Sequence, residues 1–190
     1  RCAPGLRPFG VPLNSNTLYA KRNPMPLIIP KQSSVCLIRD YEEGDVPLIA
    51  EIEFDAETKR FVGVPKGTKE QWIEKASLDL LFGWVVVALP ENEVAGRVCM
   101  NRAKDRAPGV AEFEIIIAKR FWGRRLGREV ATLMIPAAFN ELNAKAVRAE
   151  VHPENEASLA LLDRFGFKYK CKATKAPMLL YEVDRSAAGV

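Results

Sequence analysis

The chain has 190 residues, of which 48% are hydrophobic and 27% are charged, and this is the composition of a single globular domain rather than of a disordered or fibrous protein. The net charge of +4 does not indicate a nucleic-acid-binding surface, because residues 1–34 hold five basic residues and no acidic one, so the rest of the chain has a net charge of −1. No apolar run reaches the roughly 18 residues of a membrane span, and the four cysteines form no CxxC pair. We therefore expect no membrane insertion, no metal site and a reducing, cytoplasmic setting.

The first 34 residues contain six of the 13 prolines and follow neither the period of a strand nor that of a helix. We therefore predict a disordered N-terminal extension over residues 1–34, with Met25 as a candidate native start. A folded domain is expected over residues 35–185, followed by a short tail over residues 186–190.

From residue 35 the hydrophobic pattern becomes regular. A strand in "SVCLIRDY" is followed by a helix that begins near Asp45, whose carboxylate is expected to cap the first turn, and by a second helix between Thr68 and Gly83. The stretches "WVVVAL" and "VAGRVCMNRA" flank the turn "PENE" and predict a hairpin, and "VAEFEIII" predicts a further strand.

The second half of the chain alternates between helical and strand patterns. In order, it predicts a long helix over residues 127–142, a strand over 146–152, a short helix over 155–167 that ends at a glycine, and closing strands over 167–173 and 178–184. This order predicts a mixed α/β domain with a parallel crossover around the long helix.

The stretch "FWGRRLGREVATLM", residues 121–134, places glycines and basic side chains at the start of the long helix. A helix N-terminus presents unpaired N–H groups and the positive end of the helix dipole, so it binds anions such as phosphate. Gly123 and Gly127 would let the backbone approach such a ligand, and the surrounding charge comes from Lys119, Arg120, Arg124, Arg125 and Arg128. The alternative is two ordinary glycines beside a basic face that contacts solvent.

The run "AEFEIIIAKRFWGRRLGREVATLM", followed by "RAEVHPENEASLALLDRFGF", resembles the acetyl-CoA-binding core of the GNAT superfamily of N-acetyltransferases. The similarity covers roughly residues 35–184. The closest pattern is that of the branch that contains the ribosomal-protein N-terminal acetyltransferases and many antibiotic-modifying relatives. The resemblance implies a mixed, largely antiparallel sheet with a splayed central pair of parallel strands and flanking helices.

The resemblance also implies where acetyl-CoA would bind. The pantetheine arm would pair with the backbone of Ile115, Ile116 and Ile117, and an N–H near Ile115 would face the thioester oxygen as an oxyanion donor. The family's pyrophosphate loop, Q/R-x-x-G-x-G/A, falls on Trp122, Gly123, Arg124, Arg125, Leu126 and Gly127, with Arg128 beside it. Trp122 replaces the first polar residue of the motif, as is usual in that branch, and Arg125 replaces its first glycine.

The second motif implies further site residues. Asn155 would touch the cofactor arm, and a role as the N-cap of the following helix stays open beside it. The family often has a tyrosine seven residues later as the acid for the leaving thiolate, and this chain has Leu162 there. Ser158 matches a serine proposed for that duty in the N-terminal acetyltransferase branch, with a capping or packing role as its alternative.

The reaction needs a base as well, because an amine with a pKa near ~10.4 is almost entirely protonated at pH 7. Glu150 aligns with the carboxylate that serves this purpose, through water, in one N-terminal acetyltransferase lineage, and it is the preferred candidate. Glu114 is the second candidate and shares a strand face with Glu112. His152 is a further alternative, and each glutamate could equally be a surface residue in an ion pair.

Together these residues imply an N-acetyltransferase that transfers acetyl from acetyl-CoA to a primary amine, either a protein N-terminus or a small amine, by direct attack in a ternary complex. The acceptor would lie between the helices of residues 45–82 and the last hairpin, and we expect a monomer or homodimer. Two alternatives stay open. One is a binding module that keeps the acyl-CoA site but has lost turnover, which Arg125 and Leu162 favour, and the other is a structural domain with no ligand.

Overall fold

The computed structural model describes residues 27–42, 44–63, 65–79, 83–102, 107–175 and 177–189, which form one sheet of eight strands. The strand order is β1-β2-β3-β4-β5-β6-β8-β7. The strands are β1 (Lys31–Gln32), β2 (Cys36–Arg39), β3 (Trp84–Ala88), β4 (Glu93–Arg102), β5 (Val110–Ile117), β6 (Ala146–Val151), β7 (Lys168–Lys172) and β8 (Leu179–Asp184). Neighbouring strands pair antiparallel, except that β5 and β6 are parallel. This arrangement confirms the fold class predicted from the sequence.

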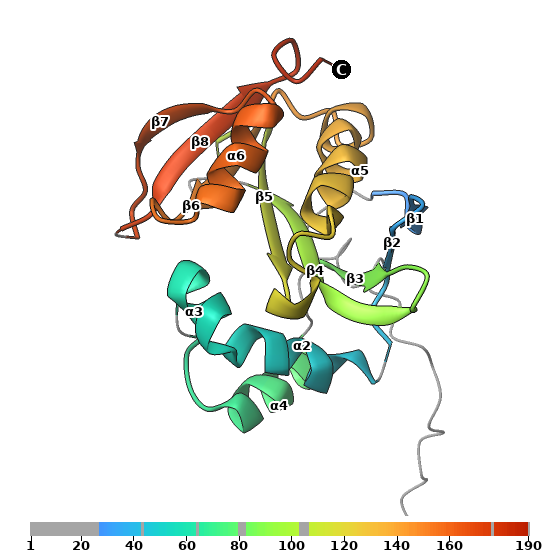
Figure 1. Cartoon of the computed structure of the whole chain (residues 1–190). Helices are drawn as coiled ribbons and strands as arrows, with labels where there is room; N and C mark the ends of the chain where they lie inside the picture. The colour runs from blue at the N-terminus through green and yellow to red at the C-terminus, as the bar shows by residue number, and fades with distance from the viewer. Residues whose placement is uncertain are drawn as a thin grey trace, which may run out of the picture.

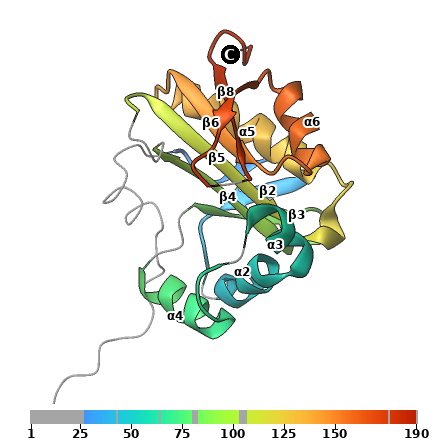
Figure 2. The ribbon, with the colours of Figure 1, turned by 90° about the vertical axis from the view of Figure 1, so that its left-hand side faces the viewer.

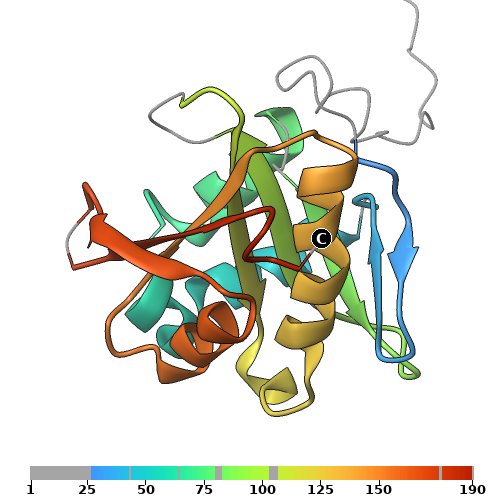
Figure 3. The same cartoon turned by 90° about the horizontal axis from the view of Figure 1, so that it is seen from above.

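Helices cover both faces of this sheet. They are α2 (Asp45–Phe54), α3 (Ala56–Val62), α4 (Lys69–Asp79), the 3-10 helix η1 (Lys119–Phe121), α5 (Leu126–Asn140) and α6 (Glu156–Arg164). Figures 1 and 2 show α2, α3 and α4 grouped on one side of the sheet, with α5 and α6 on the other, and Figure 3 shows α5 and α6 in front of the strands. We call these two sides the α2 face and the α5 face.

The strand β3 and the long helix α5 together supply a large share of the core. Every residue of β3 is buried, because helices cover it from both faces and its run of valines leaves no polar side chain to solvate. On α5 the buried positions recur every three or four residues, as one face of a helix requires. Trp84 of β3 and Phe139 of α5 are among the largest fully buried side chains.

The described fold begins at Leu27, inside the segment that the sequence predicts to be disordered. Leu27 is buried, and β1 adds an edge strand to β2. The Ile28 N–H donates to the Glu141 carboxylate, which also forms an ion pair with Lys31. These contacts attach residues 27–34 to the end of α5, while residues 1–26 lie outside the described residues.

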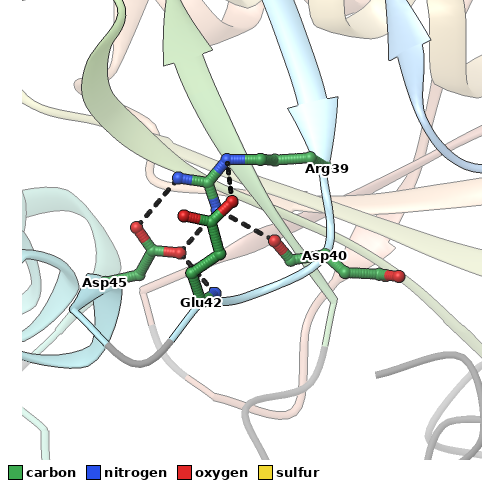
Figure 4. A network of polar contacts seen from close by, with 4 residues as sticks. All are labelled: Arg39, Asp40, Glu42 and Asp45. Atoms are coloured by element: carbon green, nitrogen blue, oxygen red, sulfur yellow. Dashed lines mark hydrogen bonds and ion pairs between the residues drawn. The ribbon is translucent and has the colours of Figure 1, made fainter. Parts of the chain in front are cut away.

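The first helix begins at Asp45 as predicted, but the role expected of Asp45 is wrong. The N-cap residue is Gly44, and the Asp45 carboxylate instead accepts two hydrogen bonds from the Arg39 guanidinium, at 2.6 and 3.0 Å, and one from the Glu42 N–H. Figure 4 shows this cluster between the end of β2 and the start of α2. Hydrogen bonding to Asp45 raises the pKa of Arg39, so this ion pair fixes the angle at which α2 leaves the sheet.

The helix α3 was not predicted. Asp55 caps its first turn by accepting hydrogen bonds from the Glu57 and Thr58 N–H groups, and Gly63, at φ 92°, ends it. The helix predicted from Thr68 is confirmed as α4, and a reciprocal pair of hydrogen bonds between Thr68 and Gln71 forms its capping box.

Gly96 lets β4 approach β5 closely next to the candidate site. A Cβ at position 96 would overlap the carbonyl oxygen of Ile116 and lie 3.0 Å from the Cα of Ile117. A glycine is therefore needed at this position for steric reasons, although its backbone conformation is ordinary.

Gly96→Ala is expected to lower the free energy of unfolding by about 2–3 kcal/mol, because backbone must move to admit the methyl group. Gly44→Ala is the matched control, since a Cβ there meets nothing within 4 Å and only the preference for glycine over alanine at an N-cap is lost, at most about 1 kcal/mol. Urea unfolding of both variants measures the difference. Equal stabilities would contradict the close approach.

Candidate active site

The two parallel strands β5 and β6 are paired over only part of their length. Their register runs from Val110 opposite Ala146 to Glu112 opposite Arg148. Beyond that pair the two strands diverge. Residues 113–117 of β5 then pair with β4 alone, and residues 149–151 of β6 pair with β8 alone. We call this diverging region the split.

The backbone of β5 presents hydrogen-bonding groups to the split. The Ile116 carbonyl lies against Gly96 of β4, and the Ala118 N–H donates to the Ala95 carbonyl, so both point away from β6. Because successive residues of a strand point their N–H and C=O groups to opposite sides, those of Ile115 and Ile117 point into the split. Of the three predicted cofactor-binding isoleucines, the first and the third are therefore placed for backbone pairing, and Ile116 bonds toward β4 instead.

Trp122 reaches back to the end of this strand. Its indole N–H donates to the Ile117 carbonyl at 2.7 Å, and its side chain remains half exposed. Trp122, which replaces the first polar residue of the motif, therefore has a structural role: its indole joins the loop to the open end of the split.

The loop after η1 turns sharply into α5. Gly123 has φ 76°, and Arg125, the N-cap residue of α5, also lies in the left-handed region at φ 65°. Arg125 therefore adopts the backbone conformation that favours glycine, as expected where it replaces the motif glycine. Its side chain makes no capping hydrogen bond, and the first helical bond joins the Glu129 N–H to the Arg125 carbonyl. The N–H groups of the first turn are thus left for a ligand or water.

The basic side chains around this helix start divide into two groups. Arg124 pairs with Glu91 at 2.6 Å, Lys119 with Glu57 and Arg120 with Glu93, so these three are engaged on neighbouring elements. Arg125 and Arg128 are exposed and form no ion pair with a described residue. Leu126 is buried in the core, and a Cβ at Gly127 would make ordinary contact with Leu161 of α6, at 3.9 Å.

Glu114 and Glu150 flank the split on the same face of the sheet. Glu112 and Arg148 are directly opposite each other, and two residues further along each strand the side chains return to that face. Glu114 therefore lies on one side of the split and Glu150 on the other. This face is the α2 face, because Glu114 forms an ion pair with Arg97, which also binds Glu53 of α2.

A partly buried arginine that the sequence analysis did not single out organises this face. Arg97 of β4 donates to Glu114 at 2.6 Å, to Glu53, and to the Cys99 sulfur at 2.9 Å. Burial alone would lower the pKa of Arg97, but the facing Cys99, Glu114 and Glu53 raise it well above its usual value, so the guanidinium stays charged. Burial also raises the pKa of the Cys99 thiol to about 12, which makes it a neutral partner and not a nucleophile at neutral pH.

The second motif is placed at the start of α6. The Asn155 side chain accepts a hydrogen bond from the Ser158 N–H at 3.1 Å, so the capping role of Asn155 is confirmed. Ser158 is half buried in the first turn. Leu162, at the position where relatives often have tyrosine, is buried in the core. In the described part of the chain, no group of three or more metal-ligating side chains comes together, and no helix is long and apolar enough to cross a membrane.

The sequence matches the acetyltransferase (GNAT) domain family over residues 36–168. The chain therefore belongs to the GNAT acetyltransferase family.

Individual relatives are distant. An uncharacterized N-acetyltransferase, p20, of Bacillus licheniformis is 23% identical over 138 residues, which is 69% of this chain and 78% of p20. The structure of the ribosomal-protein-S5-alanine acetyltransferase of Vibrio fischeri matches with a TM-score of 0.63 at 19% identity, over 83% of this chain and 97% of that one. The aminoglycoside acetyltransferase AAC(6')-Ib in complex with coenzyme A matches with a TM-score of 0.65 at 17% identity, over 80% and 96%.

Arg125→Gly is expected to leave the free energy of unfolding unchanged or raise it by up to about 1 kcal/mol. Glycine removes the cost of about 1–2 kcal/mol of a left-handed residue with a Cβ, but it also gives the unfolded chain more freedom. Arg128→Gly is the control, because it removes the same charge from a helical position and should lower stability by about 0.5–1 kcal/mol. Thermal unfolding of the two variants is the measurement, and a larger loss for Arg125→Gly would contradict the loop conformation.

Proposed function

We propose that this protein transfers the acetyl group of acetyl-CoA to a primary amine, with both substrates meeting in the split between β5 and β6. The observation that carries the proposal is the edge of β5 that faces the split, with backbone groups of Ile115 and Ile117 directed into it and the uncapped start of α5 beyond it. Such an edge accepts a ligand that carries amide groups as if it were an added strand.

The chemical features of acetyl-CoA fit these residues. Its pantetheine arm has two amides, which suit the backbone groups of Ile115 and the N–H of Ile117, whose carbonyl already accepts from Trp122. Its phosphates suit the free N–H groups of residues 126–128 at the positive end of α5, with Arg125 and Arg128 nearby. Asn155 is proposed to contact the arm with the part of its amide that the cap does not use.

The proposed reaction forms one bond and breaks one. The amine nitrogen attacks the thioester carbonyl carbon, the carbon–sulfur bond breaks, the amine loses a proton and the thiolate gains one. An N–H at Ile115 would stabilise the oxygen as it becomes negative, a contribution of about 3 kcal/mol in comparable sites. We propose Ser158, which lies in the first turn of α6 and is half buried, as the donor to the leaving thiolate.

The two glutamates at the split are proposed to have different roles. The Arg97 guanidinium holds the Glu114 carboxylate at 2.6 Å, so a proton arriving at Glu114 would compete with an ion pair. Glu114 is therefore suited to attracting the ammonium form of the acceptor. Glu150, across the split, is the proposed base, directly or through water. The ion pair of Glu114 thus supports the preference, stated in the sequence analysis, for Glu150 over Glu114 as the base.

The acceptor is proposed to be a protein N-terminus or a small amine, in keeping with the loop pattern and Ser158 of the ribosomal-protein acetyltransferase branch. One structurally similar enzyme modifies the ribosomal protein S5 and another an aminoglycoside. Their TM-scores differ by only 0.02, so the fold does not choose between these acceptors.

A second candidate function is an acyl-CoA-binding module without turnover. Leu162 favours it, because its buried position offers no acid where relatives have tyrosine. Ser158 then decides between the two functions, since the enzyme needs that hydroxyl and the module does not.

Coenzyme A and acetyl-CoA are expected to raise the melting temperature, since a ligand at 100 times its Kd adds about 2.7 kcal/mol to the free energy of unfolding. With a panel of primary amines, acetyl-CoA should then release free thiol. Stabilisation without release for any amine would favour the binding module, and the absence of both would contradict the proposed site.

Glu150→Gln is expected to lower kcat at pH 7 by about 100-fold with little change in KM for the amine, the effect of losing a general base. Glu114→Gln should instead raise KM for the amine several-fold and change kcat less than about threefold, because only electrostatic attraction is lost. Glu74→Gln on α4 is an exposed control away from the split. The assignment of Glu150 as the base fails if Glu150→Gln lowers the rate less than tenfold, and a tenfold loss for Glu114→Gln alone would make Glu114 the base.

A further inference from the structure

The unpredicted helix α3 lies across the open end of the split. β5 ends at Ile117 and β6 at Val151, and both strands continue into loops that α3 contacts. The side chains that make these contacts are those of Glu57, Arg60 and Phe61, all within the seven residues of α3.

On the β5 side, α3 makes one ion pair and one contact between aromatic rings. Glu57 forms an ion pair with Lys119 of η1 at 3.1 Å. The Phe61 ring lies 6.4 Å from the ring of Trp122, centroid to centroid, and Trp122 is itself bonded to the Ile117 carbonyl. The helix is thus connected to the last residue of β5 through one intervening side chain.

On the β6 side the same pattern recurs. Arg60 pairs with Glu154 at 3.2 Å, and the Phe61 ring meets the His152 ring edge-on at 5.9 Å. The Lys175 ammonium, in the turn between β7 and β8, donates to the Val62 carbonyl at 3.1 Å. Phe61 therefore stands between one ring from each side of the split.

This bridge lies on the face from which an amine would approach. Glu114 and Glu150 face the α2 side, and His152 follows Glu150 by two residues, so alternation places both on that side. Phe61, between the rings of Trp122 and His152, therefore lies beyond the two glutamates at the open end of the split. The bridge consists of exposed contacts that are individually weak, yet an acceptor that displaced the ring would break several at once.

We propose that Phe61 is a specificity-determining residue, and that the α3 bridge restricts the acceptor to an amine at the end of a slender, unbranched chain. Of the two acceptors proposed above, this selects the small amine over the protein N-terminus. Phe61 closes the wide end of the split on the α2 face, so a broad acceptor clashes with the ring whereas a narrow chain passes between it and the glutamates. This inference rests on the proposed acetyl transfer.

The experiment compares two acceptors with the same unhindered CH2–NH2 group and different girth, n-hexylamine and 3,3-diphenylpropylamine. The wild-type protein is expected to prefer n-hexylamine in kcat/KM by about tenfold or more. Phe61→Ala should reduce this preference to about threefold or less, mainly by raising kcat/KM for the broad amine. Phe61→Leu should lie between the two, and Lys59→Ala on the same helix should match the wild type.

The stabilisation of each variant by CoA is measured in parallel and should equal that of the wild type. A preference that Phe61→Ala and Phe61→Leu leave unchanged, in proteins that CoA still stabilises, overturns the inference and leaves the proposed function intact. A wild-type protein that neither binds CoA nor acetylates either amine overturns the proposed function and the inference together.

Discussion

The unpaired inner edge of β5 is the constraint on which the rest of the structure depends. Backbone N–H and C=O groups inside a fold need partners, and the middle of a sheet is where a strand normally finds them on both sides. Here β5 pairs with β4 along its whole length but with β6 only as far as Glu112. The N–H and C=O groups of Ile115 and the N–H of Ile117 therefore remain for a ligand. The Ile117 carbonyl accepts from the Trp122 indole, and this bond and the close approach at Gly96 keep the strand in that position.

The two faces of the sheet carry different groups near this edge. The start of α5 and its arginines lie on the α5 face, where they can hold phosphates, while Glu114, Glu150 and α3 lie on the α2 face, where an amine can approach. The partly buried Arg97 connects β4, β5 and α2, because its charge is balanced by Glu53 and Glu114 together. The cluster thereby joins α2 to the sheet.

The elements with a long hydrophobic period were predictable, and those that depend on tertiary contacts were not. "VAEFEIII" corresponds to β5 residue for residue, and the left-handed conformation of Arg125 follows from its place in the motif. By contrast, α3 spans only seven residues, too few for a period, and its only signals are the capping Asp55 and the terminal Gly63.

The contacts of Arg97 were not predictable either. Its partners Glu53 and Glu114 are far from it in the sequence, and only the packing of α2 and the register of β4 with β5 bring them together. The sequence does show Arg97 as a charged residue inside the otherwise apolar stretch "VAGRVCM".

The most direct measurement of the central claim is amide hydrogen exchange at β5, resolved by residue, with and without CoA. If the arm of CoA pairs with the inner edge, the Ile117 N–H should exchange at least about tenfold more slowly in its presence. Acetyl-CoA, whose thioester oxygen the Ile115 N–H is proposed to bind, should slow exchange at Ile115 as well. The Ile116 N–H faces β4 and should change far less, which makes it an internal reference on the same strand. Binding of CoA that slows all three amides equally, or none of them, would contradict the account.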